Sequence, residues 1–337
     1  MYRLLDPSVM DCKDRIMQIK TRLTELLGMK HPVLLAPMDL VSDGRLASVV
    51  SAAGGLGLIG GGYGDASWLE RELDVAKNAR IGVGFITWSL AKQPELLDLA
   101  LERSPLAIML SFGDISPFVD KIKNAGALVI CQIQSVGQAR EVIEKGADVL
   151  VAQGGEAGGH GVSRGTFGLV PAVCDIARDV PVVAAGGVAD GRSLAAALML
   201  GADGVLMGTR FYATQEAAGP TGAKNAIVQA GGDQTIRSIL FDIARGNVWP
   251  RPYTGRVLSN DFSEKWRGRE TELMQRPDEH ERYNQARNKG DFRTAAVIAG
   301  EAVDLISDIP QAREVVQRVV SEAHALMTTA KNRYRAV

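Results

Sequence analysis

The strongest constraint on the fold of this 337-residue chain is a series of short apolar segments that recurs through its first two thirds. Each segment has the continuous apolar character of a β-strand buried on both faces, and each intervening stretch is long enough for one helix. Eight such units over about 180 residues favour a closed (β/α)8 barrel, a TIM barrel, over an open doubly wound sheet. The expected strands are residues 33–38, 56–61, 81–88, 107–112, 128–133, 149–153, 181–186 and 204–211.

Composition and charge argue against several classes of protein. The 38 Lys and Arg nearly balance the 39 Asp and Glu, so the net charge of −1 does not suggest a nucleic-acid surface or a polybasic membrane patch. Three cysteines without CxxC spacing indicate neither a disulfide framework nor a metal site. Because we find no signal-peptide pattern and no apolar run near the roughly 20 residues that span a bilayer, we expect a cytoplasmic protein.

The sequence pattern changes after residue 211. Residues 215–304 contain Gly-Pro and Gly-Gly pairs and a charged stretch at 264–291, without a strong strand signal. We therefore expect a mostly helical insertion, or lid, after the eighth strand, with residues 247–260 irregular. Apolar residues at three- and four-residue steps from 312 to 327 predict a closing helix. The predicted organisation is a barrel of residues 1–214 and 305–337, whose bottom is covered by a helical leader at 1–30, and a substrate-covering lid at 215–304.

The segment 153–161, Q-G-G-E-A-G-G-H-G, places His160 in a glycine-dense loop after the sixth expected strand. Active-site groups of a TIM barrel lie on the loops that follow the strands. Histidine titrates near neutral pH, so His160 is a candidate proton-transfer group. The alternative is a glycine-rich turn in which the histidine only satisfies the backbone.

Other strand ends carry a pattern typical of ligand binding. Gly186 and Gly187 stand at the end of the seventh segment, and Gly208 and Thr209 stand in the second half of the eighth; at these strand ends barrels of this type bind phosphate through backbone N–H groups. We therefore expect a phosphate-bearing ligand. Gln153 could donate and accept hydrogen bonds in the plane of a heterocycle, or simply cap a barrel layer.

Together these segments resemble one known family. A-P-M at 36–38, Q-G-x-E-A-G-G-H-G at 153–161, A-A-G-G at 184–187 and M-G-T-R-F at 207–211 are similar to the nitronate monooxygenases, formerly 2-nitropropane dioxygenases, which are FMN-dependent TIM barrels. The resemblance implies FMN across the barrel mouth and His160 as the active-site histidine. It implies that Ala36, Pro37 and Met38 pack on the flavin ring, that Gln153 meets the polar edge of the ring and that Gly158 lines the loop. The implied phosphate residues are Gly187, Leu206, Met207, Gly208 and Thr209, and Gly186 beside them is a further cofactor-binding candidate.

Some positions depart from the family pattern. Many members carry an asparagine in the third strand, where this chain reads Ile-Gly-Val-Gly at 81–84, and well-studied members read Gly-Gln where this chain has Gly300 and Glu301. The lid tyrosines of the family are not clearly matched, and Tyr253 and Tyr283 are the candidates.

The resemblance implies oxidation of alkyl nitronates, and also of nitroalkanes, with O2 to a carbonyl compound and nitrite. His160 would act as the base or stabilise the anion. The alternatives are an FMN-dependent NAD(P)H:quinone reductase or enoyl-acyl carrier protein reductase, and a catalytically inactive flavin- or phosphate-binding barrel. The expected partners are small molecules, namely a nitronate, O2 or NAD(P)H, and a homodimer is compatible with the sequence.

Overall fold

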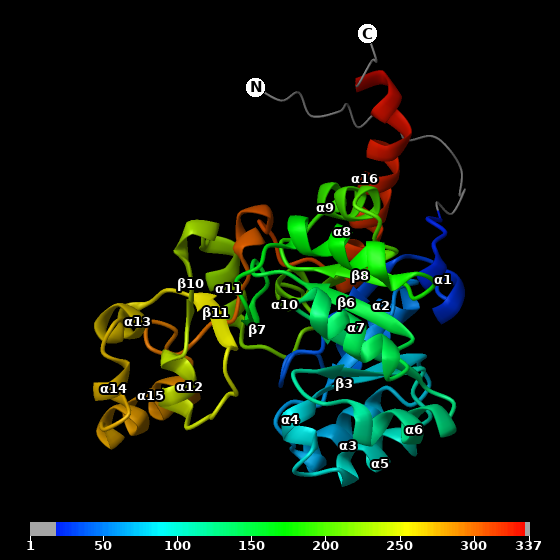
Figure 1. The fold of residues 1–337 in the computed structure, drawn as a ribbon. Coiled ribbons are helices and arrows are strands. Elements are labelled where there is room, and N and C mark those ends of the chain that lie inside the picture. The colour runs from blue at the N-terminus through cyan, green and yellow to red at the C-terminus, as the bar shows by residue number, and fades with distance from the viewer. Residues whose placement is uncertain (1–17, 334–337) are drawn as a thin grey trace.

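Eight parallel strands form the centre of the computed structural model, which describes residues 18–333 (Figure 1). Their order around the sheet is β1-β9-β8-β6-β5-β4-β3-β2. A parallel bridge between Leu34 and Leu56 brings the two ends of the sheet together and closes the barrel. The strands lie within the eight expected segments, which confirms the predicted TIM barrel. They are β1 (Val33–Leu35), β2 (Gly57–Gly60), β3 (Ile81–Ile86), β4 (Ala107–Ser111), β5 (Leu128–Ile133), β6 (Val149–Gln153), β8 (Val182–Ala185) and β9 (Gly204–Met207).

Apolar side chains fill the barrel interior, including Leu58, Met109 and Val151. The helix α1 (Arg22–Leu27) inserts Leu23 and Leu27 into the same cluster and ends at Gly28 in the left-handed conformation. It therefore covers one end of the barrel, as expected for the part of the leader that the structure describes; residues 1–17 lie outside the described residues.

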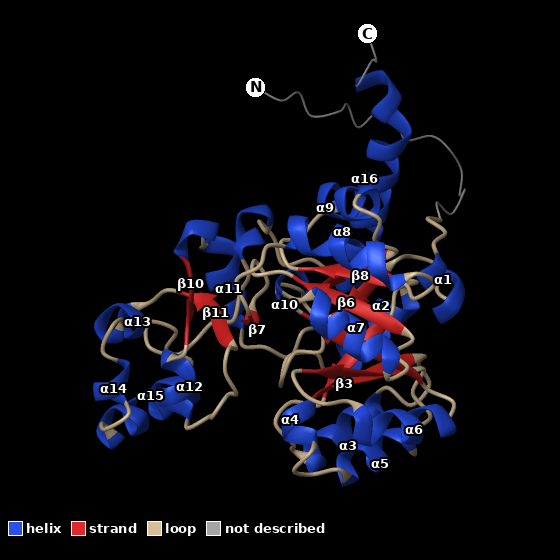
Figure 2. Cartoon of the chain, in the orientation of Figure 1, coloured by secondary structure: helices blue, strands red, loops and turns tan. Residues whose placement is uncertain are grey.

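Helices surround the strands on the outside (Figure 2). The closing helix α16 (Ala312–Arg333) is confirmed, and it packs on α9 and α2 through a buried apolar face. Within residues 18–333, no helix is both long and apolar enough to cross a membrane. The other barrel helices are α2 (Gly44–Ala52), α3 (Ala66–Val75), α4 (Thr87–Leu90), α5 (Glu95–Leu101), α6 (Ser116–Asn124), α7 (Val136–Glu144), α8 (Thr166–Ala177), α9 (Gly191–Met199) and α10 (Thr209–Tyr212).

The segment between α10 and α16 stands beside the barrel and is coloured from green to orange in Figure 1. It has a hydrophobic core of its own, in which Trp266 and Tyr283 are the largest fully buried side chains. Its elements are α11 (Thr221–Gln229), η2 (Gly232–Gln234), β10 (Thr235–Ser238), α12 (Leu240–Arg245), β11 (Thr254–Leu258), α13 (Asp261–Trp266), α14 (Glu270–Leu273), α15 (Pro277–Lys289) and η3 (Glu301–Leu305).

The insertion is mostly helical, as expected, but it also contains a β-hairpin, so the expectation of an irregular segment at 247–260 was wrong for residues 254–258. β10 and β11 pair antiparallel, and β11 also pairs with β7 (Gly159–Gly161), which lies in the segment expected to be a glycine-rich loop. The hairpin lacks an apolar run because Arg237 and Arg256 point their guanidinium groups at the carbonyl oxygen of Gly155. His160 therefore lies on a short strand that is bonded to the insertion.

Candidate active site

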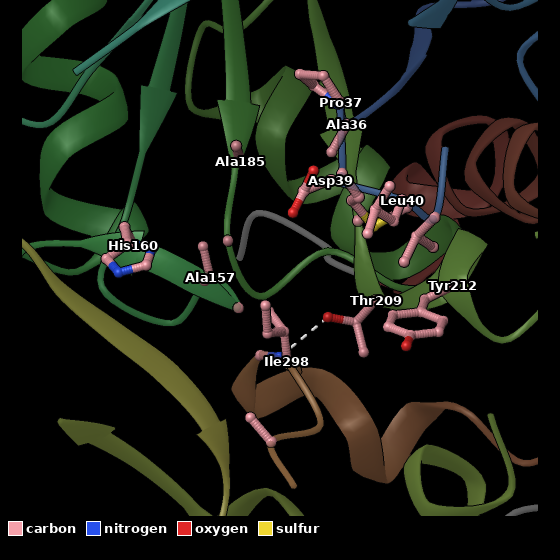
Figure 3. Close-up of a pocket in the computed structure, with 18 of the residues that line it drawn as sticks. Ala36, Pro37, Asp39, Leu40, Ala157, His160, Ala185, Thr209, Tyr212 and Ile298 are labelled. Carbon is pink, nitrogen blue, oxygen red and sulfur yellow. Dashed lines mark hydrogen bonds between the residues drawn. The ribbon is translucent and has the colours of Figure 1, made fainter. Parts of the chain in front are cut away.

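A cavity of about 660 Å³ lies at the C-terminal ends of the barrel strands, where this fold places its active sites (Figure 3). One wall consists of residues that follow β1, β6, β8 and β9. The facing wall comes from the insertion and includes Arg245, Trp249 and Tyr283. The volume is in the range of pockets that bind cofactors and small substrates.

All of the predicted site residues except Met207 line this cavity. Met207 is buried on the opposite face of β9 from Leu206, because successive side chains of a strand alternate in direction. This result concerns placement, and the roles assigned to these residues stay predictions. The predicted residues that line the cavity are Ala36, Pro37, Met38, Gln153, Gly158, His160, Gly186, Gly187, Leu206, Gly208 and Thr209.

The loops after β8 and β9 present backbone N–H groups to the cavity. Gly186 and Gly187 have φ values of 96° and 73°, a region that glycine adopts most readily. In the described part of the chain, the amides of Gly187, Gly208 and Thr209 donate to no other group. Such unpaired amides form an anion-binding concavity.

Two neighbouring glutamines fix the orientation of the Gln153 amide. Its Oε1 accepts hydrogen bonds from Nε2 of Gln132 at 3.0 Å and from Nε2 of Gln134 at 2.9 Å. Because a carbonyl oxygen accepts at most about two hydrogen bonds, the NH2 of Gln153 is the group left for a ligand.

The segment around Gly158 contacts the segment around Gly300 backbone to backbone. A Cβ on Gly300 would lie 2.6 Å from the carbonyl oxygen of Glu156, and a Cβ on Gly158 would lie 2.8 Å from the nitrogen of Gly300. Glu301 N donates to Glu156 O at 2.9 Å, and Gly300 N donates to Thr209 Oγ1 at 3.0 Å, the dashed line in Figure 3. These glycines are therefore required by close packing of the cavity wall.

Two of the departures from the family pattern have local structural explanations. A Cβ on Gly84 would lie 2.3 Å from Cγ of Pro37, so the proline ring occupies the space that a larger side chain would need. The carboxylate of Glu301 lies 2.8 Å from the guanidinium of Arg256, which balances its charge.

Asp242 and Trp249 of the insertion hold the imidazole of His160. His160 Nε2 lies 2.9 Å from Oδ2 of Asp242, and the side chains are 10% and 8% exposed. The Trp249 ring stacks on the imidazole with 3.4 Å between centroids and 6° between planes. Burial lowers the pKa of His160, and the neighbouring Asp242 opposes this shift in part. Burial therefore favours the neutral imidazole over the imidazolium.

Aromatic rings continue from Trp249 towards the barrel. Its Nε1 donates to the hydroxyl of Tyr63 at 3.0 Å, and burial raises the pKa of Tyr63 to about 12. Of the two candidate lid tyrosines, Tyr283 lines the cavity, whereas Tyr253 lines a smaller neighbouring cavity of about 210 Å³.

Arg245 brings a positive charge to the insertion side of the cavity. Its Nε donates to the hydroxyl of Tyr283 at 3.3 Å, and no carboxylate pairs with it among the described residues. Arg245, Asp242 and Trp249 were not predicted from the sequence. Their segment carries no motif, and Asp242 is 82 residues from its histidine partner.

The sequence is similar to a known family and to proteins of that family. Residues 20–100 and 74–322 match the family model described as nitronate monooxygenase. A nitronate monooxygenase of Neurospora crassa is 34% identical over an alignment of 343 positions, which covers 87% of this chain and 89% of that protein.

The chain is also similar to a dehydrogenase and to a solved structure. The (3aS,4S,5R,7aS)-5-hydroxy-7a-methyl-1-oxo-octahydro-1H-indene-4-carboxyl-CoA dehydrogenase of Rhodococcus jostii is 39% identical over 227 residues, covering 66% of this chain and 64% of that protein. The solved structure of FabK from Thermotoga maritima has a TM-score of 0.81 at 29% identity and covers 94% of this chain and 100% of that chain. The chain therefore belongs to the nitronate monooxygenase family of oxidoreductases.

Proposed function

We propose that the protein binds FMN and uses it to oxidise alkyl nitronates, and also neutral nitroalkanes, with O2 to a carbonyl compound and nitrite. The observation that carries this proposal is that one cavity is lined both by residues suited to a flavin and by a buried histidine that Asp242 holds in place. The family is generally flavin-dependent, and the Neurospora relative is named for nitronates.

The residues of the cavity wall fit FMN. The amides of Gly187, Gly208 and Thr209 suit a phosphate group. A Cβ added at Gly208 would lie 3.5 Å from Cβ of Ala36 and 3.7 Å from Sδ of Met38, so it would not clash with either side chain. Ala36 and Pro37 offer a flat apolar surface, and the free NH2 of Gln153 suits a ring carbonyl or nitrogen. When bound there, the flavin supplies the electron-transfer chemistry.

The side chains around the cavity would handle the proton and the negative charge of the substrate. Neutral His160 accepts the α-proton of a nitroalkane, which converts the substrate into the nitronate anion. Arg245 places a positive charge where an anion could bind. No carboxylate forms a salt bridge with it among the described residues, although Asp242 lies near enough to raise its pKa. The rings of Trp249 and Tyr63 and the rest of the insertion limit the access of water, so residues 215–304 act as the lid over the substrate.

A second candidate is favoured by the Rhodococcus relative, which is named as a dehydrogenase of a CoA thioester. The name of this relative supports a thioester substrate only. In this alternative the electrons flow in the opposite direction to that of a dehydrogenase, because NAD(P)H reduces the flavin, which passes the electrons to an enoyl thioester or a quinone.

The test is an anaerobic titration of the purified protein, followed by its flavin absorbance. We expect a yellow protein whose flavin spectrum changes on addition of ethyl nitronate and not on addition of NADH. A flavin that NADH bleaches and the nitronate leaves unchanged favours the second candidate. A colourless protein that does not bind added FMN contradicts both.

A further inference from the structure

We propose that Asp242 is a positioning residue that holds His160 in the tautomer with its proton on Nε2, so that Nδ1 is the nitrogen that exchanges a proton with the substrate. The inference rests on the proposed role of His160 in proton transfer. It goes beyond that role in two ways: a residue of the insertion controls the tautomer of the base, and Nδ1 is named as the nitrogen that reacts.

The geometry of the pair fixes the tautomer. His160 Nε2 and Asp242 Oδ2 are 2.9 Å apart, and both side chains are about nine-tenths buried. An ionised carboxylate only accepts hydrogen bonds, so Nε2 of a neutral imidazole must be the donor. Among the described residues the imidazole makes its hydrogen bond through Nε2 alone, and Nδ1 is not among the fully buried nitrogens that lack a partner, so its lone pair is free and accessible.

The packing around the imidazole prevents the ring from readily turning to exchange its nitrogens. Trp249 covers one face of the imidazole, and its Nε1 is tied to Tyr63 on the barrel. The backbone of His160 is paired with that of Gly255 on β11. A Cβ added at Gly255 would lie 3.5 Å from Nε2 of the imidazole, so the backbone of β11 lies close to that edge of the ring. A ring flip would break the bond to Asp242 and leave a buried carboxylate unpaired, which is costly.

The charges that face the imidazole act in both directions. Asp242 raises the pKa of His160, whereas burial, which is the larger effect, and the positive charges of Arg245 on α12 and Arg237 on β10 lower it. The net effect is a neutral base at pH 7. When Nδ1 takes a proton, the Asp242 carboxylate stabilises the imidazolium that forms, as the buried aspartate of a catalytic triad does for its histidine.

The direct test is nitrogen NMR of the holoenzyme labelled with 15N-histidine. The chain has four histidines, and a His160→Asn sample identifies the signals of residue 160. We expect the wild-type His160 to be neutral at pH 7 with its proton on Nε2, and Asp242→Asn to lose this preference. A wild-type ring protonated on Nδ1 overturns the inference, whatever the enzyme's substrate.

The kinetic test compares Asp242→Asn, Asp242→Glu and Asp233→Asn with nitroethane as substrate. Asp233 is an exposed carboxylate of the same insertion and serves as the control. We expect Asp242→Asn to keep its flavin and to lower kcat about 100-fold, within the range of general-base effects, with little change in KM. The acid limb of its pH profile should move to lower pH, because the carboxylate that raises the pKa of His160 is gone. Asp242→Glu should recover part of kcat.

The outcomes separate the two proposals. An unchanged kcat and pH profile in Asp242→Asn overturns the positioning role. The role is also overturned if Asp242→Asn and Asp242→Glu lower kcat equally while His160 keeps the wild-type tautomer in both. If the wild type oxidises neither nitronates nor nitroalkanes, the proposed function fails, and the NMR test of the Asp242–His160 pair still stands.

Discussion

At the scale of single residues, the proposed chemistry depends on an imidazole that is neutral because it is buried. The pKa of His160 lies below the ordinary histidine value of 6.5. A group with a lowered pKa keeps its lone pair free at neutral pH, so proton abstraction by His160 should be fully available at pH 7 and should decline only in more acidic solution.

The corresponding prediction concerns His160→Asn. We expect this variant to bind FMN as the wild type does and to lose turnover of neutral nitroethane by about 10²- to 10⁴-fold, the usual contribution of a general base. The turnover of ethyl nitronate, which needs no proton removal, should fall much less. Steady-state oxygen consumption with the two substrates measures this, with His324→Asn on α16 as the control. Equal turnover of nitroethane by variant and wild type would rule out proton abstraction by His160.

The sequence motifs were enough to place His160 at the cavity, but not the groups that control it. Asp242 and Trp249 are common residue types in a segment without periodicity, and they reach His160 only through the antiparallel pairing of β7 with β11. Met207 was assigned to the cavity wall with its neighbours, and the alternation of side chains along β9 turns it away.

At the scale of secondary-structure elements, the loop after β6 and the segment before η3 depend on each other. Their backbones are too close for any side chain at Gly158 or Gly300, and each supplies hydrogen bonds that hold the cavity wall. The same contact places Gly300 N on Thr209, which belongs to the proposed phosphate site.

Gly300→Ala tests this contact. The added methyl group would lie 2.6 Å from Glu156 O, so the two segments must separate. We expect a loss of about 1–3 kcal/mol in unfolding free energy, as for overpacking elsewhere, together with weaker FMN binding. Gly168→Ala is the matched control: Gly168 lies in α8 with open space where its Cβ would lie, and the substitution should stabilise by about 0.5–1 kcal/mol. Chemical denaturation and flavin titration provide the data, and equal behaviour of the two variants would contradict the close-contact argument.

The elements differ in how well the sequence predicted them. The barrel strands have apolar side chains on both faces and were located within a few residues. The three strands of the small sheet were missed because β7 is mostly glycine and the hairpin of β10 and β11 carries arginines that bind backbone carbonyl groups. Their pairing depends on contacts distant in sequence, which local patterns do not encode.

At the scale of the whole molecule, the cavity lies at the boundary between the barrel and the insertion. The barrel supplies the strand-end loops, and the insertion supplies Arg245, Trp249 and Tyr283 from a segment with its own hydrophobic core. A ligand that fills the cavity would contact both parts, and it would therefore stabilise their arrangement as well as each part.

We therefore expect removal of FMN to lower the thermal stability of the protein and to increase protease cleavage within residues 215–304. A ligand at 100 times its Kd adds about 2.7 kcal/mol to the stability of the state that binds it. Differential scanning fluorimetry of apo and reconstituted protein, with limited proteolysis mapped by mass spectrometry, measures both effects. A Tm that does not depend on FMN, or cleavage that increases only in the barrel, would contradict the placement of the cofactor between the two parts.

The pairing of β7 with β11 has a consequence for how such enzymes can be recombined. The strand that carries His160 has its hydrogen-bonded neighbour nearly a hundred residues later in the chain, so the histidine segment and the insertion form one exchangeable unit. A chimera that takes the insertion from a relative and keeps the local barrel would replace both the strand that pairs with β7 and the residue at position 242 that holds the histidine. Substrate preference in these enzymes should therefore be transplanted with residues 153–161 and the insertion together.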